Sequence, residues 1–531
     1  MFEAEFNRLV QIDQLLKSRD YDALEVLTSD EMARGLLSDD ALNAARLLKL
    51  PATVIYLTSL AVENLAKPFR FQAWLAVYQS LARGEQTEAF VALPAKHPLK
   101  VVALALLQQN TLDAVALKKC HGGLEGWVQA AELAMDHDQF GLLEQLVREL
   151  VRRKTDPQDL LKLTKVLFNR HTHIGKSANV EPLGNSYIAI RDSLPGRLPT
   201  VVRVRSTLAL FASQCFFSSG NHAASIQIAQ QATHPAGRIH AAFDTARAHC
   251  HAGQLPESIH WLDQLTTLMC AEDAAAPPLS EDEAEEQKKA TAVFDPGHAS
   301  LALLDLQTAL SQVGKQAFLV SGTLLGYARE GQILAHDKDI DVGIIGWEDQ
   351  FDVVSAILQS GLFGIDSRRL RGSKSYHIPV MHLETRVSID IFIYHPEGGK
   401  LVTGVESYFG YLQKFAFTPF GLKSVKFLGI DFYVPDDVER NLLENFGNWR
   451  QSDPDYISHL QSPSTVDVGG LVYQIVGRLR ALEAIRAKKY EKLSRAIELM
   501  DRCKDRPCGI PEPTLEQLRS VLDAHKTMEV A

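Results

Sequence analysis

The segment over residues 270–300 divides the chain into two parts with different sequence patterns. It reads CAEDAAAPPLSEDEAEEQKKATAVFDPGHAS, which is acidic, rich in Ala, Pro and Ser, and poor in large apolar side chains. Such a segment buries too little apolar surface to order itself, so we interpret it as a linker. Because 531 residues exceed one ordinary domain, we expect an α+β multidomain protein. Its expected parts are an all-α domain (1–268), a flexible acidic linker (269–299), a mixed sheet with helices (300–460) and a helical extension (461–531).

The charge balance argues against nucleic acid as a partner. The formal net charge is −10 at pH 7, whereas binding to phosphate backbones is driven by Lys and Arg. The share of hydrophobic residues, 46%, is that of an ordinary soluble globular protein.

The sequence also predicts a cytoplasmic protein. The first residues, MFEAEFNRLVQIDQLLKSRD, carry early acids and no continuous apolar run, unlike a secretory signal. No stretch reaches the roughly 18 apolar residues that span a membrane. The six cysteines show no zinc-like spacing and are expected to be reduced thiols, although Cys503 and Cys508 could form a bridge.

Residues 1–268 are rich in Leu and Ala and contain a weak internal repeat. Gly220 and Gly253 occupy matching places in two stretches, as do Ser225 and Ser258. The offset is close to the roughly 34-residue period of tetratricopeptide helix pairs, in which a glycine turns the chain between two helices. A similar stretch surrounds Gly84. We expect a degenerate tetratricopeptide-like solenoid that binds a protein partner, the alternative being an irregular helical domain.

A candidate phosphate-binding turn lies at the start of the second half. The apolar strand QAFLV leads into SGTLLGYAREG, where Gly322 and Thr323 stand at the start of a helix. Backbone N–H groups at a helix start attract phosphate, and glycine permits close approach. Turns of this kind are often only structural, so the acids that follow decide the interpretation.

Two aspartates share one face of the next predicted strand. In DIDVGII, Asp339 and Asp341 are two positions apart, about 7 Å along the backbone, while Ile340 and Val342 face a core. Neighbouring carboxylates repel each other and raise each other's pKa, and a divalent cation removes that conflict. Mg²⁺ suits such a site because it prefers oxygen ligands and keeps waters that substrate phosphates can replace.

A third aspartate lies in the apolar strand RVSIDIFIYH. There, Asp390 would be costly unless it were paired or bound to metal. If the two strands are neighbours, the three acids form a site for Mg²⁺ or Mn²⁺. The alternative is an edge strand with exposed acids, or an acid paired with Arg.

These motifs together resemble the LicD and fukutin-related family, which has a nucleotidyltransferase fold. The resemblance rests on GTLLGYAREGQILAHDKDIDVGI, on SIDIF, and on YVPDDVERNLLENFGNW, in which Gly447 and Trp449 match and Phe446 replaces the family's Tyr. It covers about residues 310–455. Lys338 replaces the middle Asp of the family's acidic run, and His336 stands where Trp is frequent.

The resemblance implies a metal-dependent phosphotransferase. Such an enzyme moves a phospho-alcohol, for example phosphocholine or ribitol phosphate, from a CDP-linked donor to a hydroxyl of a glycan or lipid-linked glycan, and releases CMP. Asp339, Asp341 and Asp390 would hold one or two ions, and Asp390 would take the proton of the acceptor hydroxyl. The setting would be the modification of cell-surface polysaccharide or lipopolysaccharide.

Further residues would contact the donor if the resemblance holds. Gly322 and Thr323 would cradle its phosphates, with Arg329 beside them, unless Arg329 forms a surface salt bridge instead. Tyr376 and the adjacent His377 would face the donor. Asp337 would either help to hold the metal through water or cap its loop.

Two other functions use the same sequence. One is a nucleotidyltransferase that moves NMP from an NTP to a small molecule or protein, and the other is a scaffold with an inactive transferase domain. The sequence also predicts one long amphipathic helix over residues 471–500 with a basic face. This face either contacts the inner membrane surface or a phosphorylated glycan, or is solvated while the helix packs on the domain.

Overall fold

The computed structural model of the protein describes most of the chain beyond residue 92. The described residues are 93–108, 112–121, 123–137, 139–171, 180–195, 199–275, 295–335, 337, 339–346, 350–365 and 375–530, together with positions 11 and 14. The predictions for Gly84, His336, Lys338 and most of the linker lie outside them. Contacts group the chain into two compact units, Ala76–Leu268 and Met1–Leu75 with Met269–Ala531. We call them the helical unit and the sheet unit.

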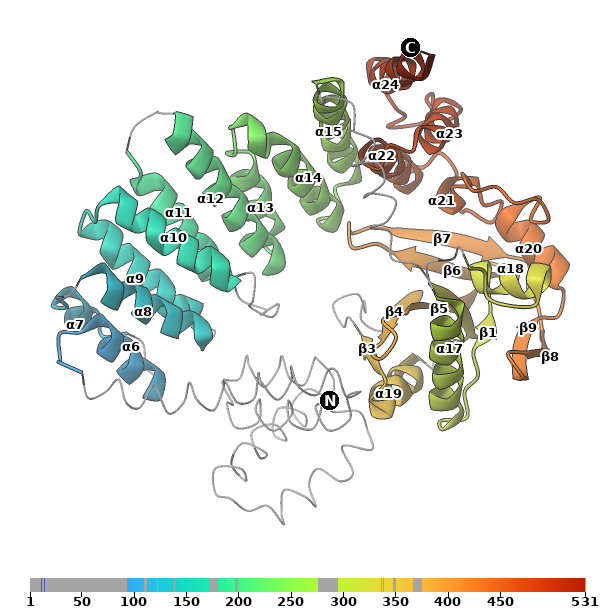
Figure 1. Cartoon of the computed structure of the whole chain (residues 1–531), viewed down its shortest axis with the longest axis horizontal. Helices are drawn as coiled ribbons and strands as arrows, with labels where there is room; N and C mark the ends of the chain where they lie inside the picture. The colour runs from blue at the N-terminus through green and yellow to red at the C-terminus, as the bar shows by residue number, and fades with distance from the viewer. Residues whose placement is uncertain are drawn as a thin grey trace. The chain divides into compact units, whose positions relative to one another are not determined.

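Every regular element described in the helical unit is an α-helix, as expected for the first half (Figure 1). Successive helices pack on one another through Leu, Ala and aromatic side chains. The helices are α6 (Pro98–Leu107), α7 (Ala114–Lys118), α8 (Leu124–Asp136), α9 (Phe140–Arg152), α10 (Pro157–His171), α11 (Glu181–Ser193), α12 (Pro199–Ser218), α13 (His222–Ala229), α14 (Pro235–His251) and α15 (Leu255–Ala275).

The two stretches that match in sequence form two similar helix pairs. Gly220 turns the chain between α12 and α13, and Gly253 does so between α14 and α15, with φ angles of 78° and 76°. These left-handed conformations are easy only for glycine. The matching serines, Ser225 and Ser258, are buried, and each lies against the preceding helix through a hydrogen bond of 2.8–2.9 Å. The local repeat seen in the sequence is therefore also a repeat of packing.

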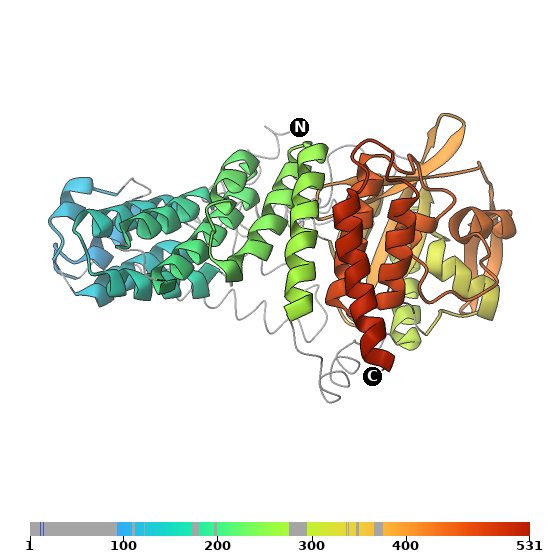
Figure 2. The same cartoon turned by 90° about the horizontal axis from the view of Figure 1, so that it is seen from above.

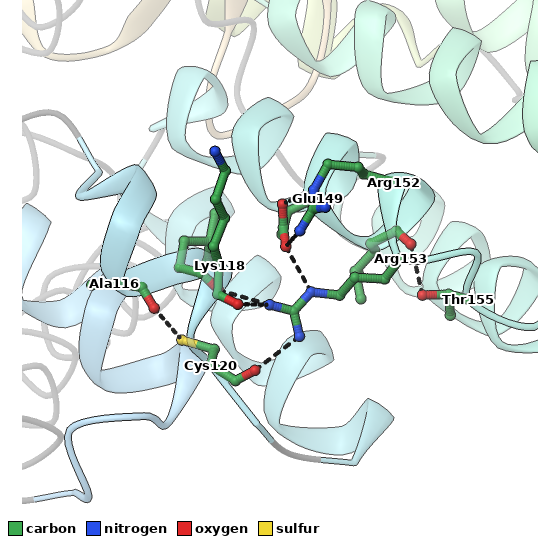
Figure 3. Close-up of polar contacts among 9 residues, drawn as sticks. Ala116, Lys118, Cys120, Glu149, Arg152, Arg153 and Thr155 are labelled. Atoms are coloured by element: carbon green, nitrogen blue, oxygen red, sulfur yellow. Dashed lines mark hydrogen bonds and ion pairs between the residues drawn. The ribbon is translucent and has the colours of Figure 1, made fainter.

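A buried ionic cluster joins α7 to α9 (Figure 3). Glu149 is 6% exposed and accepts hydrogen bonds of 2.7 Å from Arg152 and Arg153. These bonds outweigh the effect of burial and lower the pKa of Glu149 to about 2. The Arg153 guanidinium lies over the Trp127 ring and also donates to backbone carbonyls at the end of α7, those of Leu117, Lys118 and Cys120.

The sheet unit contains a mixed sheet with helices. Within the described residues the strand order is β3-β4-β5-β2-β1-β9-β8, with β6 joined to β5 and β7. The pairs β2–β5 and β1–β9 are parallel and the others antiparallel. The strands are β1 (Phe318–Leu319), β2 (Ile340–Ile345), β3 (Phe363–Ile365), β4 (His377–His382), β5 (Ser388–Glu397), β6 (Lys400–Glu406), β7 (Leu412–Phe417), β8 (Leu422–Phe427) and β9 (Ile430–Pro435).

The central strands present different residues to the two faces of the sheet, because side chains alternate along a strand. One face carries Ile340 and Val342 of β2 with Ile389 and Ile391 of β5, all fully buried. Helices α17 (Pro296–Ser311) and α19 (Gln350–Ser360) contribute to the core on this face. The other face carries the acids, so the apolar face fixes the strands that position them.

Helix α18 (Ser321–Glu330) lies between β1 and β2. The C-terminal residues form five further helices: α20 (Val438–Phe446), α21 (Ser458–Gln461), α22 (Leu471–Arg486), α23 (Tyr490–Asp501) and α24 (Glu512–Val530). The prediction of one helix over 471–500 is wrong. The chain breaks at Lys488, whose φ is 53°, and α23 folds back beside α22, with α22 against β7 (Figure 2, red).

No helix in the described part of the chain is long and apolar enough to cross a membrane.

Candidate active site

The acidic face of the sheet borders a cavity of about 1130 Å³. A cluster of four carboxylates lines it, together with an aromatic wall from β5 and β7, a loop over residues 447–457 that adds a fifth carboxylate, Asp453, and two cations from α23. The clustered carboxylates are Asp337, Asp339, Asp341 and Asp390; the wall is Phe392, Tyr394, Phe415 and Phe417; the cations are Lys492 and Arg495.

Two of these carboxylates come from neighbouring strands in register. The parallel pairing of β2 and β5 sets Asp341 directly opposite Asp390, and adjacent strands are about 4.8 Å apart. The sequence predicted a shared acidic site only if these two strands were neighbours, and they are. Both side chains line the same cavity.

The start of α18 holds Asp341. The Gly322 N–H donates to Asp341 Oδ2 at 2.8 Å, and the Asp341 N–H donates to Thr323 Oγ1 at 2.8 Å. Gly322 lines the cavity, whereas Thr323 is only 1% exposed and does not. The N–H of Gly322, expected to be free for phosphate, is therefore used to position a carboxylate.

The environment of Asp341 disfavours its charge. Burial raises its pKa well above the usual range, and the nearby carboxylates of Asp339, Asp337 and Asp390 raise it further, whereas the Gly322 N–H lowers it. A cation at this place would reverse the balance. The ionised form of Asp341 is therefore unfavourable at this position unless a positive charge lies beside it.

A side chain at position 322 would displace the carboxylates around it. A Cβ atom there would lie 2.6 Å from Asp337 Oδ2 and 3.1 Å from Asp341 Oδ2. The preceding Ser321 has a φ of 44°, an uncommon conformation for a residue with a side chain. Its Oγ accepts a hydrogen bond of 3.2 Å from Asn445 of α20.

Asp390 is more accessible and has a histidine beside it. Its side chain is 25% exposed, and its Oδ1 lies 3.0 Å from Nε2 of His377, which is 4% exposed. The imidazole stacks on Phe392, with ring centroids 5.3 Å apart. Tyr376 points to the other side of the strand, where its hydroxyl donates to Glu397 and its N–H to Glu406, and it does not line the cavity.

Arg329 lines the cavity and bonds to the loop over residues 447–457. It donates to the backbone carbonyl of Trp449 and, at 3.0 Å, to that of Gln451. Both carbonyls belong to the loop over 447–457, most of which lines the cavity. In this structure Arg329 therefore secures one wall of the cavity.

The chemistry of the acidic cluster fits a hard divalent cation. Four carboxylates around one cavity supply the oxygen ligands that Mg²⁺ and Mn²⁺ prefer. Among the described residues, no three His, Cys, Asp or Glu side chains already converge closely enough to hold an ion. A bound metal would therefore have to draw the carboxylates together, and its positive charge would offset their mutual repulsion.

Sequence reasoning did not find the residues that line the cavity from the C-terminal side. His459 is one of them, and burial, with the charge of Arg480, lowers its pKa to about 3, so this imidazole is neutral at physiological pH. Lys492 and Arg495 are others. The basic face of the predicted helix was the only signal for them in the sequence.

Residues 314–437 match the family described as LicD/FKTN/FKRP, nucleotidyltransferase domain. The sheet unit contains a LicD/FKTN/FKRP domain. The chain is also similar to curated proteins: 27% identity over 161 residues to ribitol-5-phosphate transferase FKTN of Mus musculus, and 24% over 156 residues to that of Homo sapiens. Each match covers 27% of this chain and about a third of the relative. An uncharacterised protein of Rickettsia prowazekii is 28% identical over 148 residues, which cover 52% of its length.

The match divides the cavity into two parts. All four clustered carboxylates lie inside the LicD/FKTN/FKRP domain, whereas the loop over 447–457 and the cations of α23 lie outside the matched residues. The acidic part of the cavity therefore lies within the matched segment. The aromatic wall of β5 and β7 also lies within it, whereas the loop and α23 follow it in the sequence.

Proposed function

We propose that the sheet unit is a metal-dependent phosphotransferase that moves a phospho-alcohol from a CDP-linked donor to a glycan hydroxyl. The observation that carries this proposal is the pairing of Asp341 with Asp390 in one cavity of a LicD/FKTN/FKRP domain. The similarity to proteins named as ribitol-5-phosphate transferases supports the class of group transferred.

In this proposal the carboxylates have different roles, which depend on their surroundings. Asp339, Asp341 and Asp390 would hold Mg²⁺ or Mn²⁺, which supplies positive charge to the donor diphosphate. Asp341 is fixed by Gly322 and Thr323 and serves as a rigid ligand. Because Asp390 is the more accessible of the paired acids, it also accepts the proton of the acceptor hydroxyl.

The bond changes in the proposed reaction balance. The acceptor oxygen forms a bond to the phosphorus that carries the alcohol, and the bond from that phosphorus to the bridging oxygen of the diphosphate breaks. CMP leaves with the electron pair, and the hydroxyl proton goes to Asp390. Phe392 and Tyr394 exclude water from one side of the cavity, which limits hydrolysis of the donor.

Thermal unfolding with ligands tests which donor binds. A ligand that binds only the folded protein raises its melting temperature. We expect a shift with one CDP-alcohol that requires Mg²⁺ or Mn²⁺ and is lost in Asp339→Ala and Asp341→Ala.

Two other results would replace the proposal. A shift with NTPs alone, accompanied by pyrophosphate release, would establish a nucleotidyltransferase. Absence of any shift, together with an unchanged cellular phenotype in Asp339→Ala, would establish a scaffold with an inactive domain.

We further infer that the helical unit is a degenerate tetratricopeptide-like repeat that binds a protein. The two helix pairs with equivalent glycines and serines support a repeat. All six cysteines are free, which supports a reducing compartment such as the cytoplasm. Co-purification of a partner with the full chain, lost when surface residues of α12–α15 are changed, would test the first point.

A further inference from the structure

Helix α23 brings two cations to the cavity that holds the four clustered aspartates. Lys492 and Arg495 both line it. They are three positions apart on one helix, so they share a face. Neither residue belongs to the segment that matches the LicD/FKTN/FKRP domain. The cavity therefore has an acidic part within that domain and a cationic part supplied by the C-terminal helices.

Arg495 already has an anionic group beside it. Its guanidinium lies 3.0 Å from Oδ2 of Asp453, and the two side chains are 34% and 36% exposed. Ion pairs this accessible to water contribute little to stability, typically 0–1 kcal/mol. Asp453 itself lines the cavity, so an oxyanion of a ligand could replace its carboxylate at Arg495 without a large loss.

The size of the cavity leaves room for a second group. About 1130 Å³ exceeds the roughly 300–1,000 Å³ typical of a site for one small ligand. A transfer reaction has two substrates, and the acidic part with its metal would hold the diphosphate of one of them. Lys492 and Arg495, which line another part of the same cavity, could then bind an anionic group that the metal does not contact.

We propose that Lys492 and Arg495 form a phosphate-binding subsite in this cavity. The subsite takes a phosphomonoester or phosphodiester group, whose oxygens match the planar guanidinium and the ammonium. This proposal rests on the proposed function, because it names a second recognition point for its substrates. The phosphate belongs either to the donor diphosphate or to a phosphorylated acceptor.

The test measures binding of inorganic phosphate to the full chain by calorimetry, with EDTA present so that no metal takes part. We expect Lys492→Ala and Arg495→Ala each to weaken binding about tenfold, the size expected for one charge-assisted hydrogen bond. Arg502→Ala is the matched control. Arg502 is exposed at the end of the same helix, pairs with Glu498 and does not line the cavity, so its loss should change nothing.

Asp453→Asn separates recognition from a structural role of Arg495. If Arg495 binds phosphate, removal of the competing carboxylate strengthens phosphate binding severalfold. If Arg495 only secures the loop through Asp453, Asp453→Asn weakens binding as Arg495→Ala does, and the proposal is overturned. Equal binding by wild type and Lys492→Ala would overturn it as well.

A second arm identifies the source of the phosphate. With Mg²⁺ present, a loss of CDP affinity in Lys492→Ala assigns the subsite to the donor. Unchanged CDP affinity, with weakened inorganic phosphate binding that CDP does not compete with, assigns it to the acceptor. Because phosphate binding is measured without metal or donor, failure of the CDP-dependent reaction would leave this result standing.

Discussion

At the scale of single residues, the site depends on backbone groups that position carboxylates. Gly322 and Thr323 hold Asp341 in the structure, and their contact with phosphate stays a prediction. The i, i+2 spacing of Asp339 and Asp341 predicted a shared face because alternation is a local property of a strand. Because side chains alternate, either Tyr376 or His377 must face the acids, and the sequence alone does not tell which. The pairing of β4 with β5 shows that it is His377.

Asp341→Asn should make the metal-free protein more stable and inactive. The amide keeps the shape and an acceptor for Gly322 but removes a buried charge that three carboxylates repel. We expect unfolding free energy to rise by roughly 1–2 kcal/mol at pH 7, measured by urea unfolding in EDTA. A loss of stability would contradict the account.

The same residue predicts a pH dependence. Because the pKa of Asp341 is raised in the folded state, the folded protein binds more protons than the unfolded chain between pH about 4 and the folded pKa. Its contribution to stability is therefore present at low pH and lost as pH rises through the folded pKa. Urea unfolding at several pH values should show a weaker decline in Asp341→Asn than in the wild type, and parallel curves would refute this origin.

Gly322→Ala should reduce activity more than stability. The new Cβ would meet Asp337 Oδ2 at 2.6 Å, and a carboxylate at the end of a side chain can move away at small cost. We expect a change below about 1 kcal/mol in unfolding free energy, with at least about a tenfold loss of turnover. Gly141→Ala, where the added Cβ meets nothing within 4 Å, is the control that should retain activity.

At the scale of elements, long-range contacts explain what the sequence pattern could not predict. The apolar stripe over residues 471–500 continues across Lys488, so periodicity alone indicated one helix, whereas tertiary packing folds α23 back onto α22. In the helical unit, α7 has five residues, too few for a stable isolated helix. The Glu149–Arg153 cluster attaches its C-terminal carbonyls to α9.

Arg153→Ala should therefore loosen α7 and α9 locally. The change leaves Glu149 with one arginine and removes the donor to three carbonyls, which should cost about 2–3 kcal/mol. Hydrogen exchange of peptides from α7–α9 measures it. Arg148→Ala breaks the exposed pair with Glu144 on the same helix and should cost below about 0.5 kcal/mol. Equal effects of both changes would show that the cluster has no special role.

At the scale of the whole molecule, one of the two boundaries between the compact units, Leu268/Met269, lies where the sequence pattern changes, whereas the other, Leu75/Ala76, falls within the predicted first domain. The helical half follows from local periodicity, and the acidic part of the site follows from the spacing of its aspartates together with the resemblance to the LicD and fukutin-related family. The position of Lys492 and Arg495 could not be predicted in this way. It depends on α23, which lies about a hundred residues after Asp390 in the sequence and still lines the same cavity.

Ligand binding should therefore change hydrogen exchange in the sheet unit alone. Mg²⁺ with a CDP-alcohol should slow hydrogen exchange in peptides within 295–530 and leave those within 93–268 unchanged, because every residue that lines the cavity lies in the sheet unit. Protection confined to the helical unit would place the ligand elsewhere.

The central claim is tested most directly by following CMP release from CDP-ribitol and CDP-choline, with Mg²⁺ and a glycan acceptor, by chromatography. The account predicts CMP formation that requires the metal, transfers the phospho-alcohol to the acceptor, and falls at least about a thousandfold in both Asp341→Asn and Asp390→Asn. Metal-dependent turnover that survives both changes would contradict the assignment of the paired aspartates as the active site.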